Sequence, residues 1–281
     1  MVISIATFGA VIFFILGTIV GSFLNVVVLR LGTGRGFGGR SGCFSCGKTL
    51  QLFELVPILS YLFLGGRCHR CKSSISIQYP LVEVLTGVVF ALIFREWFSG
   101  FYIPNLFEVF SLALSLVAAS LLIAIGVYDI RHKIIPQTLV LLLISNGLII
   151  ASGRLYLGVH LLSPTFLALD FLAGPIFYLF FYGLSYVSAG RWMGYGDSKL
   201  VLGLGLLLGF VSGLSGLIFA FWIGALVGII LIAVPYVLPV FGLKGSHLAV
   251  TMKTEIPFAP FLIFGAACAF FLHINVFSLF Q

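Results

Sequence analysis

Long apolar stretches recur along the whole of this chain and decide what it can fold into. About 20 apolar residues in a helix cross the hydrocarbon core of a bilayer, and a single spanning segment must be helical so that its backbone polar groups are paired. About eight stretches meet or approach this length, near residues 4–29, 80–97, 106–128, 134–152, 166–188, 198–212, 216–241 and 259–277. The sixth is short and rich in glycine, so pairing with the seventh as a hairpin is one arrangement open to it.

The composition supports the same interpretation, because 61% of the residues are hydrophobic and only 8% are charged. Water-soluble domains do not sustain such a balance. The first stretch has no basic region before it and is too long for a signal peptide, so we expect it to be retained as a span. The sequence therefore predicts an all-α polytopic membrane protein with about eight transmembrane helices.

The basic residues are distributed unevenly among the loops between these stretches. Of the 15 Lys and Arg, 13 fall in the first, third, fifth and seventh loops, whereas Arg95 and Arg154 fall on the opposite side. Positively charged loops stay in the cytoplasm, which predicts both termini outside and the odd-numbered loops inside. This bias and the anionic inner leaflet account for the net charge of +7, so no nucleic-acid partner is expected.

The first of these loops is the only one long enough to fold by itself, and it contains two C-x-x-C pairs. Cys43 and Cys46 form the first pair, and Cys68 and Cys71 form the second. Four thiolates at this spacing complete a tetrahedral zinc shell, which favours a closed, structural metal site. Disulfides are the alternative, but they are rare in a reducing cytoplasm. We therefore divide the chain into a first span (1–30), a zinc-binding cytoplasmic subdomain (31–79) and a membrane domain (80–281).

Two aspartates lie where apolar stretches meet the cytoplasm, in a chain with only eight acidic residues. Asp129 belongs to "IGVYDIRHKIIP" and Asp197 to "GYGDSKL". Acids at such a boundary are often merely solvated, or paired with neighbours such as Arg131 and Lys199. A functional interpretation is favoured here because both aspartates are expected at similar depth, reached from the same face, in backbone-permissive surroundings.

A pair of carboxylates in a low-dielectric site shares one proton, since both do not ionise easily. The ionised member can take a proton from water while the protonated member activates a carbonyl or a leaving amine. Gly194 and Gly196 suit such a site, because glycine permits unusual backbone angles and close approach of a substrate backbone. Glycine is equally common where membrane helices pack. We predict hydrolysis by Asp129 and Asp197, with the two glycines as active-site backbone.

These residues resemble the bacterial type IV prepilin peptidases along nearly the whole chain. The matching motifs, in order, are "GSFLNVVVLRL" at 21–31, the loop with two C-x-x-C pairs, "YDIRHKIIP", "MGYGDSKLVLGLG" and "EIPFAPFLIFG" at 255–265. The resemblance implies cleavage of the short basic leader of prepilins and pseudopilins after a glycine at the cytoplasmic boundary of the membrane. It implies that Asp129 and Asp197 carry out this reaction.

The same resemblance implies a second activity, N-methylation of the new N-terminal residue with S-adenosylmethionine as donor. The sequence has no strand followed by a glycine-rich turn and a helix, so the donor is expected between the spans and the first loop. Glu83 and Glu255 are candidates for contacting its sulfonium cation. Pairing of these two acids with cytoplasmic Lys and Arg side chains is equally compatible with the sequence.

Two other classes of protein share part of this pattern. Presenilin-like and signal-peptide-peptidase-like enzymes carry tyrosine-aspartate and G-x-G-D motifs, but the zinc loop and the flanking motifs favour a prepilin peptidase. An ion-coupled transporter could also use membrane aspartates, although it would typically have repeated halves, and no convincing repeat is found. Besides prepilins, the expected partner is membrane lipid.

Overall fold

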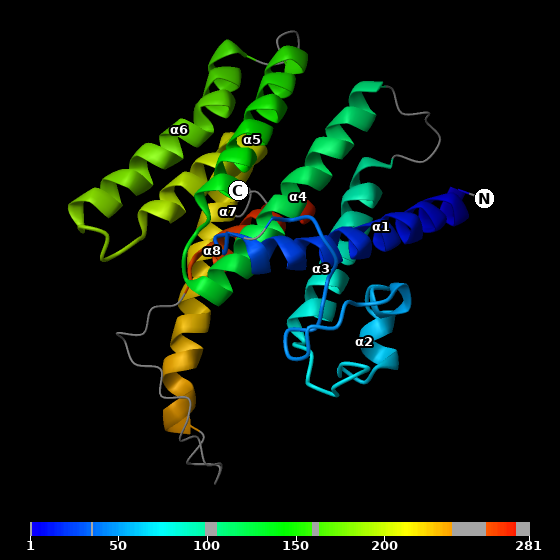
Figure 1. Cartoon of the computed structure of the whole chain (residues 1–281). Helices are drawn as coiled ribbons and strands as arrows, with labels where there is room; N and C mark the ends of the chain where they lie inside the picture. Colours follow the sequence, from blue (N-terminus) through cyan, green and yellow to red (C-terminus); the bar gives the residue numbers. More distant parts are fainter. Residues whose placement is uncertain (1, 35, 99–105, 159–162, 238–256, 274–281) are drawn as a thin grey trace. The chain divides into compact units, whose positions relative to one another are not determined.

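The computed structural model describes residues 2–34, 36–98, 106–158, 163–237 and 257–273, and these are mostly helical apart from the loop between residues 31 and 77 (Figure 1). The only β-structure in these ranges is two isolated bridges, Gly42 with Thr49 and Arg67 with Ser74. The all-α prediction is confirmed. The elements in order are α1 (Val2–Arg30), η1 (Leu52–Glu54), α2 (Leu59–Phe63), α3 (Gln78–Trp97), α4 (Leu106–His132), α5 (Gln137–Gly158), α6 (Pro164–Val187), α7 (Tyr195–Val237) and α8 (Ala259–Phe271).

Five of these helices are long and apolar enough to cross a membrane: Ala6–Arg30, Leu106–His132, Gln137–Gly158, Pro164–Val187 and Tyr195–Ala233. Helix α3 coincides with the predicted stretch at 80–97, and the shorter apolar α8 lies within the one at 259–277. At most 33% of the residues in the apolar window of any of the five are buried. Most of their apolar surface is therefore available to lipid.

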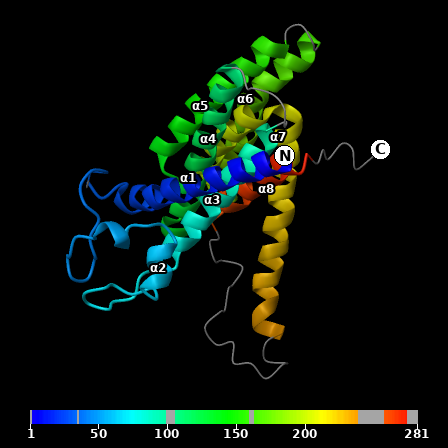
Figure 2. The same cartoon turned by 90° about the vertical axis from the view of Figure 1, so that its right-hand side faces the viewer.

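The chain forms two compact units, Met1–Val127 and Tyr128–Gln281. In the first unit, α1 and α3 approach closely because glycines remove the side chains between them. A Cβ added to Gly17 would meet the backbone of Gly87 at 2.7 Å, and one added to Gly21 would meet Cα of Glu83 at 2.8 Å. The buried Asn25 amide donates to the carbonyl of Tyr79 at 3.2 Å. The motif "GSFLNVVVLRL" at 21–31 thus packs on the beginning of α3, beside the cysteine-containing loop (Figure 2).

In the second unit, α7 is two helices that form a hairpin. Gly209 interrupts it with φ 78° and ψ −174°, a backbone conformation that is essentially restricted to glycine. A Cβ built on Gly213 would lie 3.7 Å from Cα of Gly205, whereas eight residues of continuous helix span about 12 Å. The chain therefore reverses at Gly209, and the sixth and seventh apolar stretches pair as a hairpin. The reversal falls within the predicted sixth stretch, 198–212, rather than after it.

An arginine and an aspartate stabilise this reversal by bonding to the backbone groups that it leaves unpaired. Asp170 accepts from the N–H of Phe210 at 3.0 Å, where the second helix begins. Arg154 donates to the carbonyl of Leu206 at 2.8 Å and to that of Leu207, where the first helix ends. The two side chains also form an ion pair at 3.1 Å. Each charge thus lies at the helix end whose dipole it complements.

Replacing Gly209 with alanine is expected to lower the melting temperature of the purified protein. The conformation costs a non-glycine residue up to about 3 kcal/mol, and the added Cβ would overlap the Asp170 carboxylate. For a chain of this size, that free energy corresponds to a decrease of about 6–12 °C, measured by thermal unfolding in detergent. Gly228→Ala on the same helix is the matched control, because its Cβ meets nothing within 4 Å. Equal melting temperatures for the two variants would contradict the assignment.

Candidate functional site

Asp129 is buried in the last turn of α4, with 4% of its surface exposed. The backbone N–H of Ala259, at the beginning of α8, donates to its carboxyl group. The other oxygen, Oδ2, is buried and has no hydrogen-bond partner in the described part of the chain. Buried polar atoms are nearly always satisfied, so this oxygen calls for a partner such as water, a substrate or a proton.

Asp197 lies in the first turn of α7 and is half-buried. Its Oδ2 accepts from the N–H of Gly194 at 3.2 Å, and its own N–H donates to the Gly194 carbonyl at 3.2 Å. This reciprocal pair resembles a capping box, in which the side chain of the third helical residue bonds back to the N-cap backbone. The helix N-terminus and the donated N–H both favour the ionised carboxylate, whereas burial and the charge of Asp129 oppose it.

The two carboxyl groups, both in the second unit, lie close enough for the charge of Asp129 to act on Asp197. Neither aspartate takes part in the ion pairs found among the described residues, which are Lys48–Glu54 and Arg154–Asp170. The geometry therefore brings together the two predicted aspartates. They differ in environment, since the Asp197 carboxylate caps the N-terminus of α7, whereas Asp129 has a buried oxygen without a hydrogen-bond partner among the described residues.

The two glycines before Asp197 contribute through close packing. A Cβ on Gly196 would meet Cβ of Ile135 at 3.0 Å, and one on Gly194 would meet Oδ2 of Asp197 at 3.3 Å. Neither has a positive φ, so the expected unusual backbone angles are absent. Gly196 instead lets the first turn of α7 lie against Ile135, six residues after Asp129, and this contact joins the two aspartate motifs.

Residues with no assigned role in the sequence also shape this site. Ser185, near the end of α6, is fully buried and donates to the carbonyl of Met193 at 2.9 Å. Ser188, one turn later, accepts from the N–H of Trp192 at 3.3 Å. Together they hold the segment that presents Asp197. The two serines, one helical turn apart before "GRWMGYGD", could have been recognised in the sequence as supporting residues. The bond from the Ala259 backbone to Asp129 could not, because no residue type marks it.

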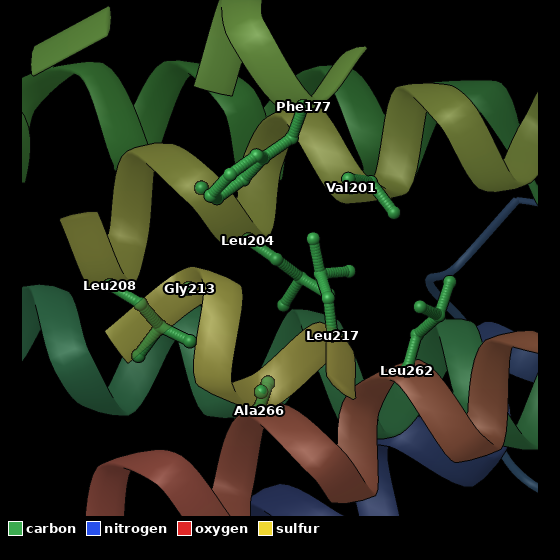
Figure 3. Close-up of a pocket in the computed structure, with 10 residues that line it drawn as sticks. Phe177, Val201, Leu204, Leu208, Gly213, Leu217, Leu262 and Ala266 are labelled. Atoms are coloured by element: carbon green, nitrogen blue, oxygen red, sulfur yellow. The ribbon is translucent and has the colours of Figure 1, made fainter. Parts of the chain in front are cut away.

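An apolar crevice lies within the α7 hairpin, between α6 and α8 (Figure 3). Phe177, Leu204, Leu217 and Leu262 line it, together with glycines of α7. The residues that line it are apolar, and neither Asp129 nor Asp197 is among them.

The four predicted zinc ligands are brought together in the first unit. Their sulfur atoms all lie within 4.8 Å of one another, and Sγ of Cys43 lies 3.7 Å from Sγ of Cys71. A tetrahedral zinc with bonds of about 2.3 Å requires sulfur atoms about 3.8 Å apart. His69 is outside this group and its ring instead packs edge-on against Phe53. The cluster therefore fits one metal ion held by four thiolates.

The two cysteine pairs occupy the same backbone arrangement twice. The N–H of Cys43 donates to the carbonyl of Lys48 at 2.9 Å, and the N–H of Cys68 donates to that of Ser73 at 2.9 Å. Gly47 and Lys72 hold equivalent positions after them, with φ values of 69° and 59°. A left-handed conformation is costly for lysine, so the second turn is maintained by its surroundings.

The thiols do not lose their protons equally. Hydrogen bonds from the backbone of Cys46 and the hydroxyl of Ser73 lower the pKa of Cys43 to about 6. Ser73 also lowers the pKa of Cys71. The Lys48 amide lowers the pKa of Cys46, but desolvation and the neighbouring thiols outweigh it and raise that pKa to about 11. Four thiolates in this space therefore require a cation, and Ser73 is a supporting residue that the spacing of the cysteines did not reveal.

Glu83 is buried on α3 and bonds to the segment that precedes α2. Its Oε2 accepts from the N–H of Ile58 at 2.7 Å, and the hydroxyl of Ser22 is a second partner. These contacts account for its burial without a bound cofactor. Glu255, the other predicted cofactor residue, lies outside the described residues.

Comparison with known sequences finds two family profiles and several similar proteins. Residues 15–97 match the bacterial peptidase A24 N-terminal domain, and residues 116–229 match the type IV leader peptidase family. The chain is 35% identical over 228 residues to a prepilin leader peptidase/N-methyltransferase of Myxococcus xanthus, covering 79% of this chain and 63% of that protein. No solved structure matches the chain.

Proteins with the same name from two other bacteria are covered more completely. The chain is 31% identical over 240 residues to that of Pectobacterium carotovorum, covering 73% of this chain and 79% of the relative. It is 32% identical over 236 residues to that of Legionella pneumophila, covering 83% and 72%.

Proposed function

Because the chain belongs to the type IV leader peptidase family, we propose that it cleaves the basic leaders of prepilins and pseudopilins with Asp129 and Asp197. The observation that carries this proposal is the pairing of two carboxyl groups in the second unit, one of which has a buried oxygen without a partner. A hydrolytic pair needs this asymmetry, because one member must accept a proton while the other donates one.

We assign the shared proton to Asp129 and the negative charge to Asp197. The N–H of Gly194 and the start of α7 stabilise an ionised Asp197. A protonated Asp129 would accept from Ala259 on one oxygen and carry its proton on the buried Oδ2. Asp197 then takes a proton from a water molecule while the oxygen of that water attacks the scissile carbonyl carbon. Asp129 donates a hydrogen bond to the carbonyl oxygen.

Collapse of the tetrahedral intermediate breaks the carbon–nitrogen bond. The leaving amine takes the proton that Asp197 received from water, and the products are the leader's carboxyl group and the new N-terminus. Asp129 again holds the shared proton, so the pair returns to its starting state. Neither a metal ion nor a covalent intermediate takes part in this sequence of steps.

We propose that this site faces the cytoplasm of the inner membrane, with both termini outside. Asp129 lies in the last turn of α4 and Asp197 in the first turn of α7. Both therefore lie at helix ends that the charge distribution assigns to the inside. Arg131, Lys133 and Lys199 flank them in sequence. A basic leader followed by an apolar helix crosses the same boundary, which brings the scissile bond to the depth of the two aspartates.

We further propose that the four cysteines hold one structural zinc and that S-adenosylmethionine donates a methyl group to the new N-terminus. The zinc would fix the two turns of the loop and has no open coordination position for catalysis. For the methyl donor, Glu83 and Glu255 stay our candidate contacts. The names of the relatives, which join peptidase with N-methyltransferase, support this second activity.

Mass spectrometry of a prepilin incubated with the purified enzyme tests both activities in one measurement. Cleavage is expected with or without S-adenosylmethionine, and a product heavier by one methyl group only with it. Glu83→Gln is expected to cleave normally but to methylate less if this carboxylate contacts the sulfonium. A parallel loss of cleavage and methylation would mean that Glu83 acts only through its bond to Ile58.

A further inference from the structure

The segment that contains η1 and α2 exposes large apolar side chains in the first unit. Leu52 and Phe63 are 87% and 85% exposed, Leu62 is 66% exposed, and Phe53 and Leu59 are about half exposed. Leu62 and Phe63 lie three and four residues after Leu59 in α2, so these three side chains share one helix face. We call these five side chains the apolar patch.

The charges around the apolar patch are of one sign. Arg67, Arg70 and Lys72 follow it in sequence and are exposed. Glu54 is the only acidic residue between positions 31 and 77, and it is buried and paired with Lys48 at 3.1 Å. The exposed surface of this loop therefore carries basic side chains and no carboxylate, which is the charge expected of a surface that meets anionic lipid.

The apolar patch is also held close to α1, a helix long and apolar enough to cross a membrane. The loop leaves α1 at Arg30 and returns into α3 at Gln78. Ile58, the residue immediately before α2, donates its N–H to Glu83. Glu83 lies five residues into α3, or about 8 Å along its axis. A Cβ on Gly21 of α1 would lie 2.8 Å from Cα of Glu83, so the bond from Ile58 to Glu83 holds the start of α2 near the apolar part of α1.

We propose that the apolar patch inserts into the boundary between headgroups and acyl chains of an anionic leaflet, with Arg67 and Arg70 bound to lipid phosphates. Interfacial helices combine an apolar face with basic residues in this way. The leaflet concerned follows from the proposed topology, but the insertion does not depend on the proposed catalysis. The docked loop would lie on the bilayer surface next to the end of α1 and the beginning of α3.

Fluorine NMR of the full-length enzyme in nanodiscs tests this proposal. A trifluoromethyl-phenylalanine placed at position 63 is examined with a lipid that carries a spin label near its headgroup and, separately, with a water-soluble gadolinium chelate. In nanodiscs containing phosphatidylglycerol, we expect the spin-labelled lipid to abolish the signal and the chelate to leave it. The same label at Phe8, which is 68% exposed on α1, provides the reference for lipid contact.

Each other outcome overturns the proposal. Broadening by the chelate alone would mean that Phe63 faces water, and protection from both reagents would mean that protein covers it, from this chain or a second copy. The variant Arg67→Gln/Arg70→Gln, with its zinc content checked, is expected to regain its signal in the presence of spin-labelled lipid. An unchanged loss of signal in that variant would refute the role of lipid phosphates.

Discussion

Replacing Asp129 or Asp197 with asparagine is expected to lower the rate of prepilin cleavage by about 10³-fold, within the range for a positioned acid or base. Asparagine keeps the shape of each side chain and can still accept the hydrogen bonds from Ala259 and Gly194. It cannot accept a proton from water, and it cannot supply a carboxylic acid proton. The measurement is the initial rate of leader release in lipid or detergent, corrected for the amount of folded protein.

The double variant distinguishes a pair that acts as a unit from two independent contributors. We expect Asp129→Asn/Asp197→Asn to be no slower than either single variant, because groups that act together are far from additive. Glu108→Gln, an acid-to-amide change in the first turn of α4, is the matched control and should stay within about twofold of the parent rate. Rapid cleavage by either single variant would exclude the pair as the catalytic groups.

Purified enzyme is expected to contain about one zinc per chain, since four thiolates complete one shell. Cys43→Ser or Cys68→Ser should abolish zinc binding and unfold the loop between α1 and α3. A structural zinc contributes about 10 kcal/mol or more to the folding of a small domain. Losing even 4 kcal/mol of local stability would raise the open population of the loop about 10³-fold. Limited proteolysis with trypsin, which cuts after Arg and Lys, reports this opening.

The fifth cysteine provides the control for this experiment. Cys268 lies on α8, outside the cluster of four sulfur atoms, so Cys268→Ser should keep both its zinc and its resistance to trypsin. Metal-free protein with an intact, protease-resistant loop would show that hydrogen bonds alone maintain the two turns. Loss of zinc in Cys268→Ser would point to a metal site of different composition.

The sequence allowed the helical class, the cluster of four cysteines and the proximity of the two aspartates to be predicted, because each depends on residue types at particular positions. The four cysteines between positions 43 and 71 could be grouped from their spacing alone. The membrane spans could be located from the length of the apolar stretches alone. The reversal of α7 was harder to locate, since apolar residues flank Gly209 on both sides and composition does not change there. Arg154 and Asp170 bond to the backbone on either side of the reversal, and both are distant from Gly209 in sequence.

The details around the aspartates depend on backbone groups and on packing, which the residue pattern does not report. Gly196 contributes through the space it leaves for Ile135 rather than through unusual backbone angles. Ala259 contributes an N–H that any residue except proline would have. The function of Glu83 in holding Ile58 was equally invisible, because nothing in the sequence connects an acid on one helix with an amide 25 residues earlier.

Ribosomes complete α5 and α6 before the part of α7 that reverses at Gly209. Arg154 and Asp170 therefore enter the bilayer before the carbonyls and the N–H that they finally bond. A lone arginine or aspartate costs about 2.5–3.5 kcal/mol to insert at the centre of a membrane helix and less near an end, and pairing the two charges at 3.1 Å reduces that cost. Helices α5 and α6 are thus expected to leave the translocon together, as a charge-neutral hairpin that later serves as the template on which α7 folds back.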